Sequence, residues 1–286
     1  MSRYRSLGLT REPFGNEPDL AFQSPALGQT DALTRLTDFV IGRGTIALVL
    51  GGLVAVSLAF GFAAERVLGP RRRIFDVPLR EGQLFREAVG NARFVALAVP
   101  AFAAMLHFAP HAPSDAPRFA LTFFVCWLAF EVLYWMLHRA MHTRAGYRFH
   151  RYHHDSRVTT PLTGYSMSTV EALGWLVALV GPPLLLSFVV PLSIEGWLAY
   201  LAYHVSGNVV GHSNAEVLGA PVARRPLSWI AHPITYHALH HARFDNHYGF
   251  GSTFMDRSLR TEWSDWTALH ARVLDGCAMT KLSECG

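Results

Sequence analysis

Fifteen histidines are spread unevenly over this sequence of 286 residues. Eight of them lie in three short motifs, in which the histidines are three or four residues apart or adjacent. The motifs read His138-Arg-Ala-Met-His142, His150-Arg-Tyr-His153-His154 and His237-Ala-Leu-His240-His241. On a helix, residues at positions i, i+3 and i+4 share one face. The spacing therefore predicts three helical faces that each carry two or three imidazole rings.

Grouped imidazoles indicate a transition-metal site, because neutral histidine is the commonest metal ligand in proteins and suits iron, zinc, copper and nickel. Eight histidines exceed the ligand number of a single ion, so the motifs predict two metal ions. The alternative is a set of surface histidines without a ligand role. One isolated pair would favour that alternative, whereas three matched sets favour metal binding. The three cysteines form no C-x-x-C pair, so no thiolate site is indicated.

The composition indicates a membrane protein. Hydrophobic residues make up 51% of the chain and charged residues only 16%, against about 25% charged residues in ordinary soluble domains. The net charge of +4 comes almost wholly from arginine, since Lys281 is the only lysine. These arginines flank apolar segments and form no separate basic patch, so we expect no nucleic acid partner. The bias toward arginine and alanine favours a bacterial origin, and hence the bacterial inner membrane.

Five apolar segments predict an all-α integral membrane bundle. The first, residues 45–64, contains no charge and is long enough to cross the roughly 30 Å hydrocarbon core as a helix. The other four cover residues 92–110, 119–137, 172–190 and 196–210. We interpret these four as two membrane hairpins that follow an N-terminal apolar helix, with a kink at Gly181-Pro182-Pro183. A short amphipathic helix over 31–40 and a surface-lying helix over 79–89 are also expected.

The distribution of arginine predicts which membrane face carries the histidines. Residues 65–93 hold seven arginines, and the positive-inside rule places such a segment in the cytoplasm. Every histidine motif lies on that same side, so we expect a cytoplasmic active site under a helical cap formed by residues 213–286. Five spans would put the arginine-containing N-terminus outside, so the first segment is either a span or a re-entrant or interfacial helix. No signal peptide is expected, because no short apolar core follows the first residues.

The order of these motifs resembles the fatty acid hydroxylase / sterol desaturase superfamily of integral-membrane di-metal enzymes. Four stretches carry the resemblance: H-R-A-M-H at 138–142, H-R-Y-H-H at 150–154, N-V-V-G-H-S-N at 208–214 and H-A-L-H-H at 237–241. The resemblance implies a catalytic domain over residues 119–261. An N-terminal tail (1–44) and a segment of membrane helices with a basic loop (45–118) would precede it, and a C-terminal tail (262–286) would follow it.

In that superfamily, histidines hold two iron ions at the cytoplasmic membrane face, and O2 is a co-substrate. Carried over by position, the resemblance implies nine metal ligands: His138, His142, His150, His153, His154, His212, His237, His240 and His241. It implies a lipid or other apolar substrate. No G-x-G-x-x-G nucleotide motif is present, so a separate electron donor of the ferredoxin or cytochrome type is expected. Zinc can replace iron in such histidine sites during purification.

Further residues are candidates for supporting the metal ligands. Asn208 stands where some members of the superfamily have another ligand histidine, so it is expected to bind a metal through water. His204, one turn earlier, is expected to support the site or to lie in the core, and Asn246 to support a ligand. Glu131 either accepts a hydrogen bond from a ligand histidine or pairs with a neighbouring polar group.

Near its end the sequence departs from the pattern of the superfamily. His232 and His247 are interpreted as supporting or surface residues. Residues 255–261 lack the aromatic residue and the glycine of the W-D-x-x-F-G-T pattern, which leaves open the local shape of the cap.

The leading functional prediction is an O2-dependent di-iron hydroxylase that acts on a C–H bond of a lipid or other apolar substrate. A desaturase or a sterol-methyl oxidase would use the same ligands, so these reactions stay open. The alternative from another class is a zinc-binding membrane protein or a transporter. Transporter ligands usually lie near the bilayer midplane, and a hydrolytic H-E-x-x-H motif is absent, so the sequence favours the oxygenase.

Overall fold

The computed structural model describes residues 32–284, with side chains from residue 44 onward. Residues 39–286 form the compact unit to which the following description applies. The expected irregular tail over residues 1–31 lies outside the described residues.

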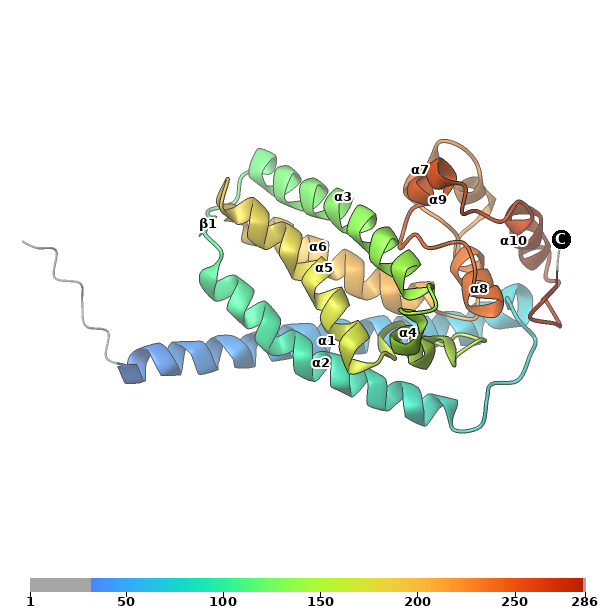
Figure 1. The fold of residues 1–286 in the computed structure, drawn as a ribbon, viewed down its shortest axis with the longest axis horizontal. Coiled ribbons are helices and arrows are strands. Elements are labelled where there is room, and N and C mark those ends of the chain that lie inside the picture. The colour runs from blue at the N-terminus through green and yellow to red at the C-terminus, as the bar shows by residue number, and fades with distance from the viewer. Residues whose placement is uncertain (1–31, 285–286) are drawn as a thin grey trace, which may run out of the picture. The chain divides into compact units, whose positions relative to one another are not determined.

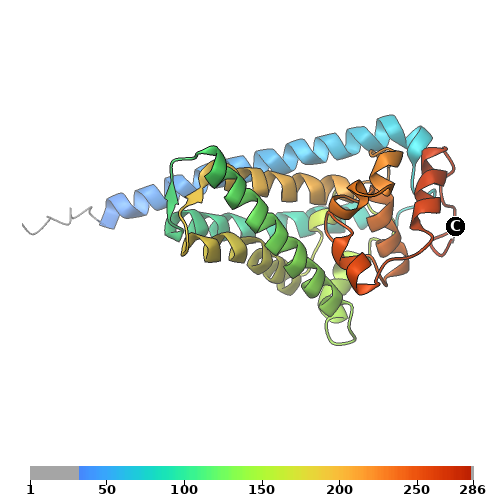
Figure 2. The same cartoon turned by 90° about the horizontal axis from the view of Figure 1, so that it is seen from above.

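Five long helices form a bundle (Figures 1 and 2). They are α1 (Ala32–Arg72), α2 (Gln83–Phe108), α3 (Ala116–Met141), α5 (Thr169–Ser187) and α6 (Ile194–Gly211). Four of them, α1 from Gly44 onward, α2, α3 and α5, are long and apolar enough to cross a membrane. The predicted all-α integral membrane bundle is therefore confirmed. The fifth segment forms a helix as predicted, but α6 is not among the four, because polar residues such as His204 and Asn208 lower its mean hydropathy.

Apolar side chains cover the outside of the bundle as well as its interior. Val56 on α1, Phe124 on α3 and Val177 on α5 are each 60% exposed or more. Exposed apolar surface of this extent suits contact with lipid. Inside, the helices share a core that includes Phe102, Phe130, Cys126, Trp197 and Tyr200.

The two hairpin turns meet at the end of the bundle away from the histidines. β1 (His111–Ala112) and β2 (Leu192–Ser193) pair as a short parallel sheet. Asp115 caps α3 by accepting from the backbone N–H of Arg118 at 2.7 Å, and Ser193 caps α6 in the same way. These contacts set the register of the hairpins, and so they align the histidine-bearing ends of α3 and α6.

Short helices form a cap at the opposite end of the bundle (Figure 1). They are α4 (Tyr147–His154), η1 (Thr163–Tyr165), η2 (Ala220–Ala223), α7 (Leu227–Ile230), α8 (Ile234–Arg243), α9 (Phe254–Leu259) and α10 (Trp266–Leu274). The cap has its own core, in which Tyr236, Leu239, Trp266 and Leu269 are almost fully buried. Residues 262–286, interpreted as a tail, thus contain α10, which packs against α8.

Two local predictions need correction. The residues expected to form helices over 31–40 and 45–64 are helical, and the second range is part of a candidate membrane span, but the expected break between them is absent because both belong to one helix, α1, from Ala32 to Arg72. The separate surface-lying helix expected over 79–89 is absent, because residues from Gln83 onward form the first part of α2. Glu87 in this part is fully buried, and its carboxylate accepts hydrogen bonds from the hydroxyl groups of Ser156, Thr160 and Thr163. Pro182 and Pro183 lie inside α5, which continues to Ser187, so the expected kink stays a prediction.

Candidate metal centre

Four helices deliver the nine predicted ligand histidines to one place. α3 supplies His138, and His142 is its C-terminal cap. α4 carries His150, His153 and His154, α8 carries His237, His240 and His241, and His212 caps the end of α6. Eight of these side chains are buried and His142 is partly buried.

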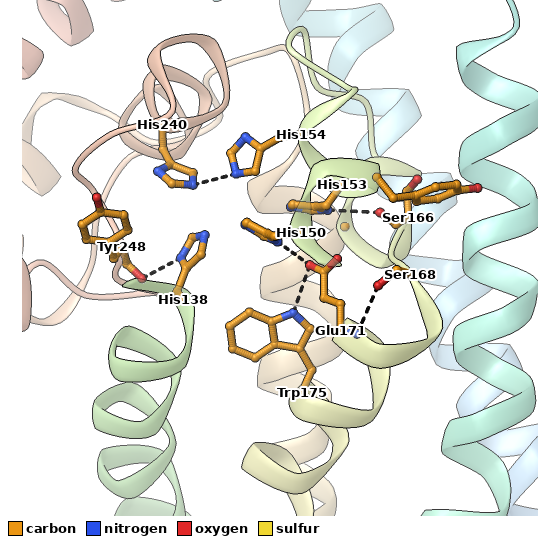
Figure 3. Close-up of polar contacts among 12 residues, drawn as sticks. His138, His150, His153, His154, Ser166, Ser168, Glu171, Trp175, His240 and Tyr248 are labelled. Carbon is orange, nitrogen blue, oxygen red and sulfur yellow. Dashed lines mark hydrogen bonds and ion pairs between the residues drawn. The ribbon is translucent and has the colours of Figure 1, made fainter. Parts of the chain in front are cut away.

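The rings gather into two separate groups, which we call group one and group two. Group one holds His138, His142, His150, His154 and His240, and group two holds His153, His212, His237 and His241. Within each group, one ring nitrogen per residue lies within 4.8 Å of the others. Figure 3 shows the rings of His138, His150, His154 and His240 turned toward a common space. The predicted ligands thus make up both groups completely.

α4 and α8 divide their histidines between the groups in a complementary way. On α4, His150 and His154 are four residues apart and join group one, while His153 joins group two. On α8, His237 and His241 are four residues apart and join group two, while His240 joins group one. An i, i+4 pair stacks along one line of a helix, and the i+3 residue lies to the side. The two helices therefore lie between the groups and contribute to both.

Hydrogen bonds fix the orientation of six of the nine rings. In each case Nδ1 lies near an oxygen: His138 to Tyr248 O (2.9 Å), His150 to Glu171 Oε1 (2.6 Å), His153 to Ser166 O (3.3 Å), His212 to Asn208 O (2.5 Å), His240 to Asn246 O (2.6 Å) and His241 to Ser156 O (3.0 Å). All six partners are acceptors, so Nδ1 carries the proton and Nε2 keeps its lone pair. A metal-binding histidine is held in this way.

The other ring nitrogens point toward one another within the groups. The buried Nε2 atoms of His138, His142, His150 and His241 have no hydrogen-bond partner among the described residues. The Nε2 atoms of His212 and His237 are 2.9 Å apart, and those of His154 and His240 are 3.1 Å apart. Buried polar atoms are normally paired. Converging lone pairs of neutral imidazoles are the donor set that a transition-metal ion requires, so the residues fit two such ions.

Burial keeps these rings neutral. It lowers the pKa of His142 and of His212 to about 4. The pKa values of the histidines on α4 and α8 are lowered well below 6.5. Burial is the largest cause of this lowering, and repulsion between neighbouring imidazoles adds to it. A neutral ring is the metal-binding form, so the groups are ready to bind cations at neutral pH.

Glu171 is the supporting residue that the sequence reasoning missed. It lies in the first turn of α5, is fully buried, and accepts from His150 Nδ1 at 2.6 Å and from Trp175 Nε1 at 3.4 Å (Figure 3). A carboxylate in this position orients the ring and makes it a stronger ligand. The available signal was Ser168-Thr-Val-Glu171, a helix-capping pattern directly before an apolar run. Ser168 does cap α5, but Glu171 turns to the histidine.

Glu131 takes the structural one of its two predicted roles. Its carboxylate accepts from Ser252 Oγ at 2.5 Å and from Gly251 N at 3.5 Å. Among the described residues, Glu131 forms no hydrogen bond to a histidine of group one or group two. It anchors the loop that carries Phe250, whose ring packs against those of Phe130 and Tyr134.

The two candidate asparagines act through their backbone. The side chain of Asn208 donates to Gly164 O at 2.7 Å, so it turns to η1 and not to a metal group. That approach requires a glycine, because a Cβ at position 164 would lie 2.8 Å from Asn208 O. The same Asn208 oxygen holds His212, and Asn246 O holds His240.

His232 and His247 belong to the cap. His247 stacks on Tyr236 with the ring centroids 3.6 Å apart and accepts from Trp263 N. His232 lies between the carbonyl oxygens of Pro233 and Phe250. Neither residue is part of the two groups, in keeping with a supporting role.

Asp256 organises the segment in which the sequence departs from its expected pattern. Its carboxylate accepts from Tyr248 N, Gly249 N, Trp135 Nε1 and Thr261 Oγ1. Arg260 ends α9 in the left-handed region at φ 57°. A residue with a side chain thus adopts the conformation that a glycine takes without strain. The turn persists, and Tyr248 stays in place to hold His138.

Two apolar cavities adjoin the histidine groups. The first lies between α2, α3, α5 and α6, reaches His150 and His153, and has a volume of about 30 Å³. The second lies between α6 and the cap and reaches His212 and His237, with a volume of about 220 Å³. Tyr134, Asn208 and Phe250 line both cavities. An apolar molecule in either cavity would lie directly against the histidines.

Comparison with known proteins agrees with this geometry. A family model described as fatty acid hydroxylase matches residues 123–261. This domain belongs to the fatty acid hydroxylase family. The resemblance seen in the histidine motifs is thereby confirmed, and the matched range contains both groups, Glu171 and the residues shared by the two cavities. No solved structure matches the chain.

Curated plant proteins are similar to this chain. The very-long-chain aldehyde decarbonylase GL1-4 of Oryza sativa subsp. indica is 29% identical over 52% of this chain and 25% of its own length. The very-long-chain aldehyde decarbonylase CER1 of Arabidopsis thaliana is 28% identical over 51% of this chain and 24% of its own length. Protein CER1-like 1 of the same plant is 26% identical over 80% of this chain and 38% of its own length. The chain thus spans between about a quarter and two fifths of the length of these relatives.

Proposed function

We propose that the protein is a membrane-bound, O2-dependent di-iron oxidoreductase that hydroxylates a C–H bond of a lipid or other apolar substrate. The observation that carries the proposal is the pair of buried histidine groups, whose free Nε2 atoms converge beside apolar cavities. Group one would hold one iron ion and group two the other. Bound iron would supply the redox chemistry that activates O2 for attack on an unactivated C–H bond.

The side chains around the groups divide the remaining tasks. Glu171 and five backbone carbonyls keep the Nδ1 protons of six rings in place, so the Nε2 atoms of these six rings stay available. Phe94, Tyr165 and Trp175 line the first cavity and exclude water from a bound apolar chain. His150 and His153 at the edge of that cavity belong to different groups, so a substrate there would lie next to both metal ions.

The arginine-rich connection supports a cytoplasmic orientation of the histidine groups. Glu65 and Arg72 near the end of α1 contact Asn214 and Glu216 of the cap. The arginine-rich residues 65–93 therefore lie at the histidine-bearing end of the bundle, and the positive-inside rule favours the cytoplasm for that end. A cytoplasmic site would receive electrons from a separate ferredoxin or cytochrome, while the substrate enters from the bilayer.

A second candidate reaction is the conversion of a long-chain aldehyde. Two of the relatives are very-long-chain aldehyde decarbonylases, and their similarity covers about half of this chain. The same ligand set would also suit desaturation or sterol-methyl oxidation. The product, and not the metal site, distinguishes these reactions.

The first experiment measures metal content. Protein from iron-supplemented, zinc-poor cells is compared with His153→Ala and with His111→Ala, a control at the exposed far end of the bundle. We expect near two irons per chain in the parent and the control, and a large loss in His153→Ala. Tightly held zinc that iron cannot replace would favour the zinc-protein alternative and contradict the proposal.

The second experiment identifies the product under 18O2 with a reductase system and a lipid substrate panel. An 18O-labelled alcohol supports hydroxylation. An alkane that lacks the aldehyde carbon would instead establish the aldehyde reaction, and a new double bond without incorporated oxygen would establish desaturation.

A further inference from the structure

One of the buried histidines outside the two groups has no hydrogen-bond partner among the described residues. His204 lies on α6, two turns before His212, and is 2% exposed. Both of its ring nitrogens lack a hydrogen-bond partner among the described residues. The other buried histidines that we describe have at least one nitrogen paired or turned toward a metal group. A buried imidazole with neither nitrogen paired loses its interactions with water on folding and regains none.

Aromatic rings surround His204. The ring centroids of Phe130, Tyr200, Phe250 and Tyr203 lie 4.0, 4.4, 5.0 and 5.1 Å from that of His204. An apolar side chain would satisfy such surroundings better than an imidazole. Packing alone therefore does not account for a histidine here.

His204 lines the same cavity as His150 and His153. Eight residues of helix separate it from His212, which is about 12 Å along the axis of α6 at 1.5 Å per residue. The other polar side chain on this wall, Asn208, is already bonded to Gly164 O and to Tyr165. His204 thus offers unused hydrogen-bonding capacity within an apolar cavity, at a distance from the metal groups.

We propose that His204 binds a hydroxyl or carbonyl oxygen of the substrate, remote from the carbon that reacts. A neutral imidazole donates from one nitrogen and accepts at the other, so it suits either oxygen type. A carboxylate is disfavoured, because no lysine or arginine lines the cavity and a buried anion requires a partner. That the bound molecule is the substrate rests on the proposed function. The substrate class is then a largely apolar molecule with one neutral oxygen group.

The test compares binding of matched probes to the metal-loaded, full-length protein. Tritiated 1-dodecanol and dodecane are titrated in detergent against the parent, His204→Leu, His204→Gln and the control His111→Leu. We expect His204→Leu to weaken dodecanol binding about tenfold, as the loss of one hydrogen bond implies, and to leave dodecane binding unchanged. His204→Gln, which keeps a donor and an acceptor, should retain most of the dodecanol affinity.

Two results would overturn the proposal. An equal loss for dodecanol and dodecane in His204→Leu, or no loss for either, would leave His204 with a packing role only. A loss of iron from His204→Leu, with His204→Gln and His111→Leu still loaded, would assign it to the metal site instead. The binding assay needs no turnover, so an absence of O2-dependent product would count against the proposed function and not against this oxygen-binding site.

Discussion

At the scale of single residues, the chemistry of the site depends on which nitrogen of each imidazole carries the proton. Spacing indicated eight of the histidines and the resemblance added His212, but neither indicated the oxygen atoms that orient them. Five of these acceptors are backbone carbonyls, which leave no mark in a sequence because every residue has one. Glu171 is the exception, since it is a side chain, and it lies 21 residues from its partner His150.

Replacement of Glu171 tests this support. In Glu171→Gln, the amide can still accept from His150, but it no longer provides a negative charge next to the ring. We expect iron affinity to fall by about 10- to 100-fold, the usual effect of losing such a partner, with the fold retained. Competition with a chelator measures the affinity. Glu195→Gln at the exposed start of α6 is the control, and equal chelator resistance in both variants would contradict the role of Glu171.

Burial of neutral imidazoles also predicts how stability depends on pH. The pKa of His212 is lowered from 6.5 to about 4. Between these values the unfolded chain binds a proton that the folded chain does not, so stability is fully present above about pH 6.5 and falls as the pH drops toward 4. The effect of His212 alone is about 3 kcal/mol, and the other group members outside the spans act in the same direction.

The measurement uses metal-free protein, because bound metal also holds the rings unprotonated. We expect the Tm to fall clearly between about pH 7 and about pH 5. A Tm that stays constant over this range would show that the histidines titrate as exposed residues do.

At the scale of elements, periodicity predicted the helices better than their ends. The apolar segments over 92–110 and 119–137 became α2 and α3, but α2 begins nine residues earlier, at Gln83. The charges and polar residues of that first part suggested a surface helix. Two of them, Gln83 and Glu87, are instead buried against the loop at 156–163, where Glu87 accepts hydrogen bonds from three hydroxyl groups. Such a long-range polar contact cannot be read from the hydropathy of one segment.

At the end of α9, the sequence departs from the family pattern, but the turn that ends the helix is kept. Arg260 takes the left-handed conformation where the pattern has glycine. We expect Arg260→Gly to raise the stability of the folded state by about 1 kcal/mol, because the strain of a Cβ in this region is removed. Thermal unfolding of the two proteins measures the difference. Arg260→Ala keeps the Cβ and is the control, so an equal gain in that variant would contradict the strain argument.

At the scale of the whole molecule, the bundle separates its two ends by function. β1 and β2 tie the hairpin turns together at one end, and the groups lie at the other, where the cap covers them. The first cavity runs into the bundle from the groups, so an apolar substrate and a water-soluble electron donor would approach from different directions. The sequence predicted that the histidine groups lie at one end of the bundle, since all the motifs lie on one side of the apolar segments. The sequence could not predict which group each histidine joins, because that depends on how α4 and α8 face each other.

The donor would meet a positively charged surface. Residues 139–154 contain no acidic residue, and four arginines in this segment are exposed: Arg139, Arg144, Arg148 and Arg151. His142, in the same segment, is the only partly buried member of the two groups. An acidic redox protein would be attracted to this face, and salt would screen the attraction.

We therefore expect the double variant Arg144→Glu/Arg148→Glu to be reduced about tenfold more slowly than the parent by an acidic [2Fe–2S] ferredoxin at low salt. The difference should shrink as salt is added. The double variant Arg224→Glu/Arg225→Glu carries the same charge change elsewhere on the cap and is the control. Stopped-flow reduction measures the rates, and dithionite, a small reductant, is run in parallel. Equal slowing with dithionite would locate the defect in the metal groups, and a difference that does not respond to salt would show that charge attraction does not guide the donor.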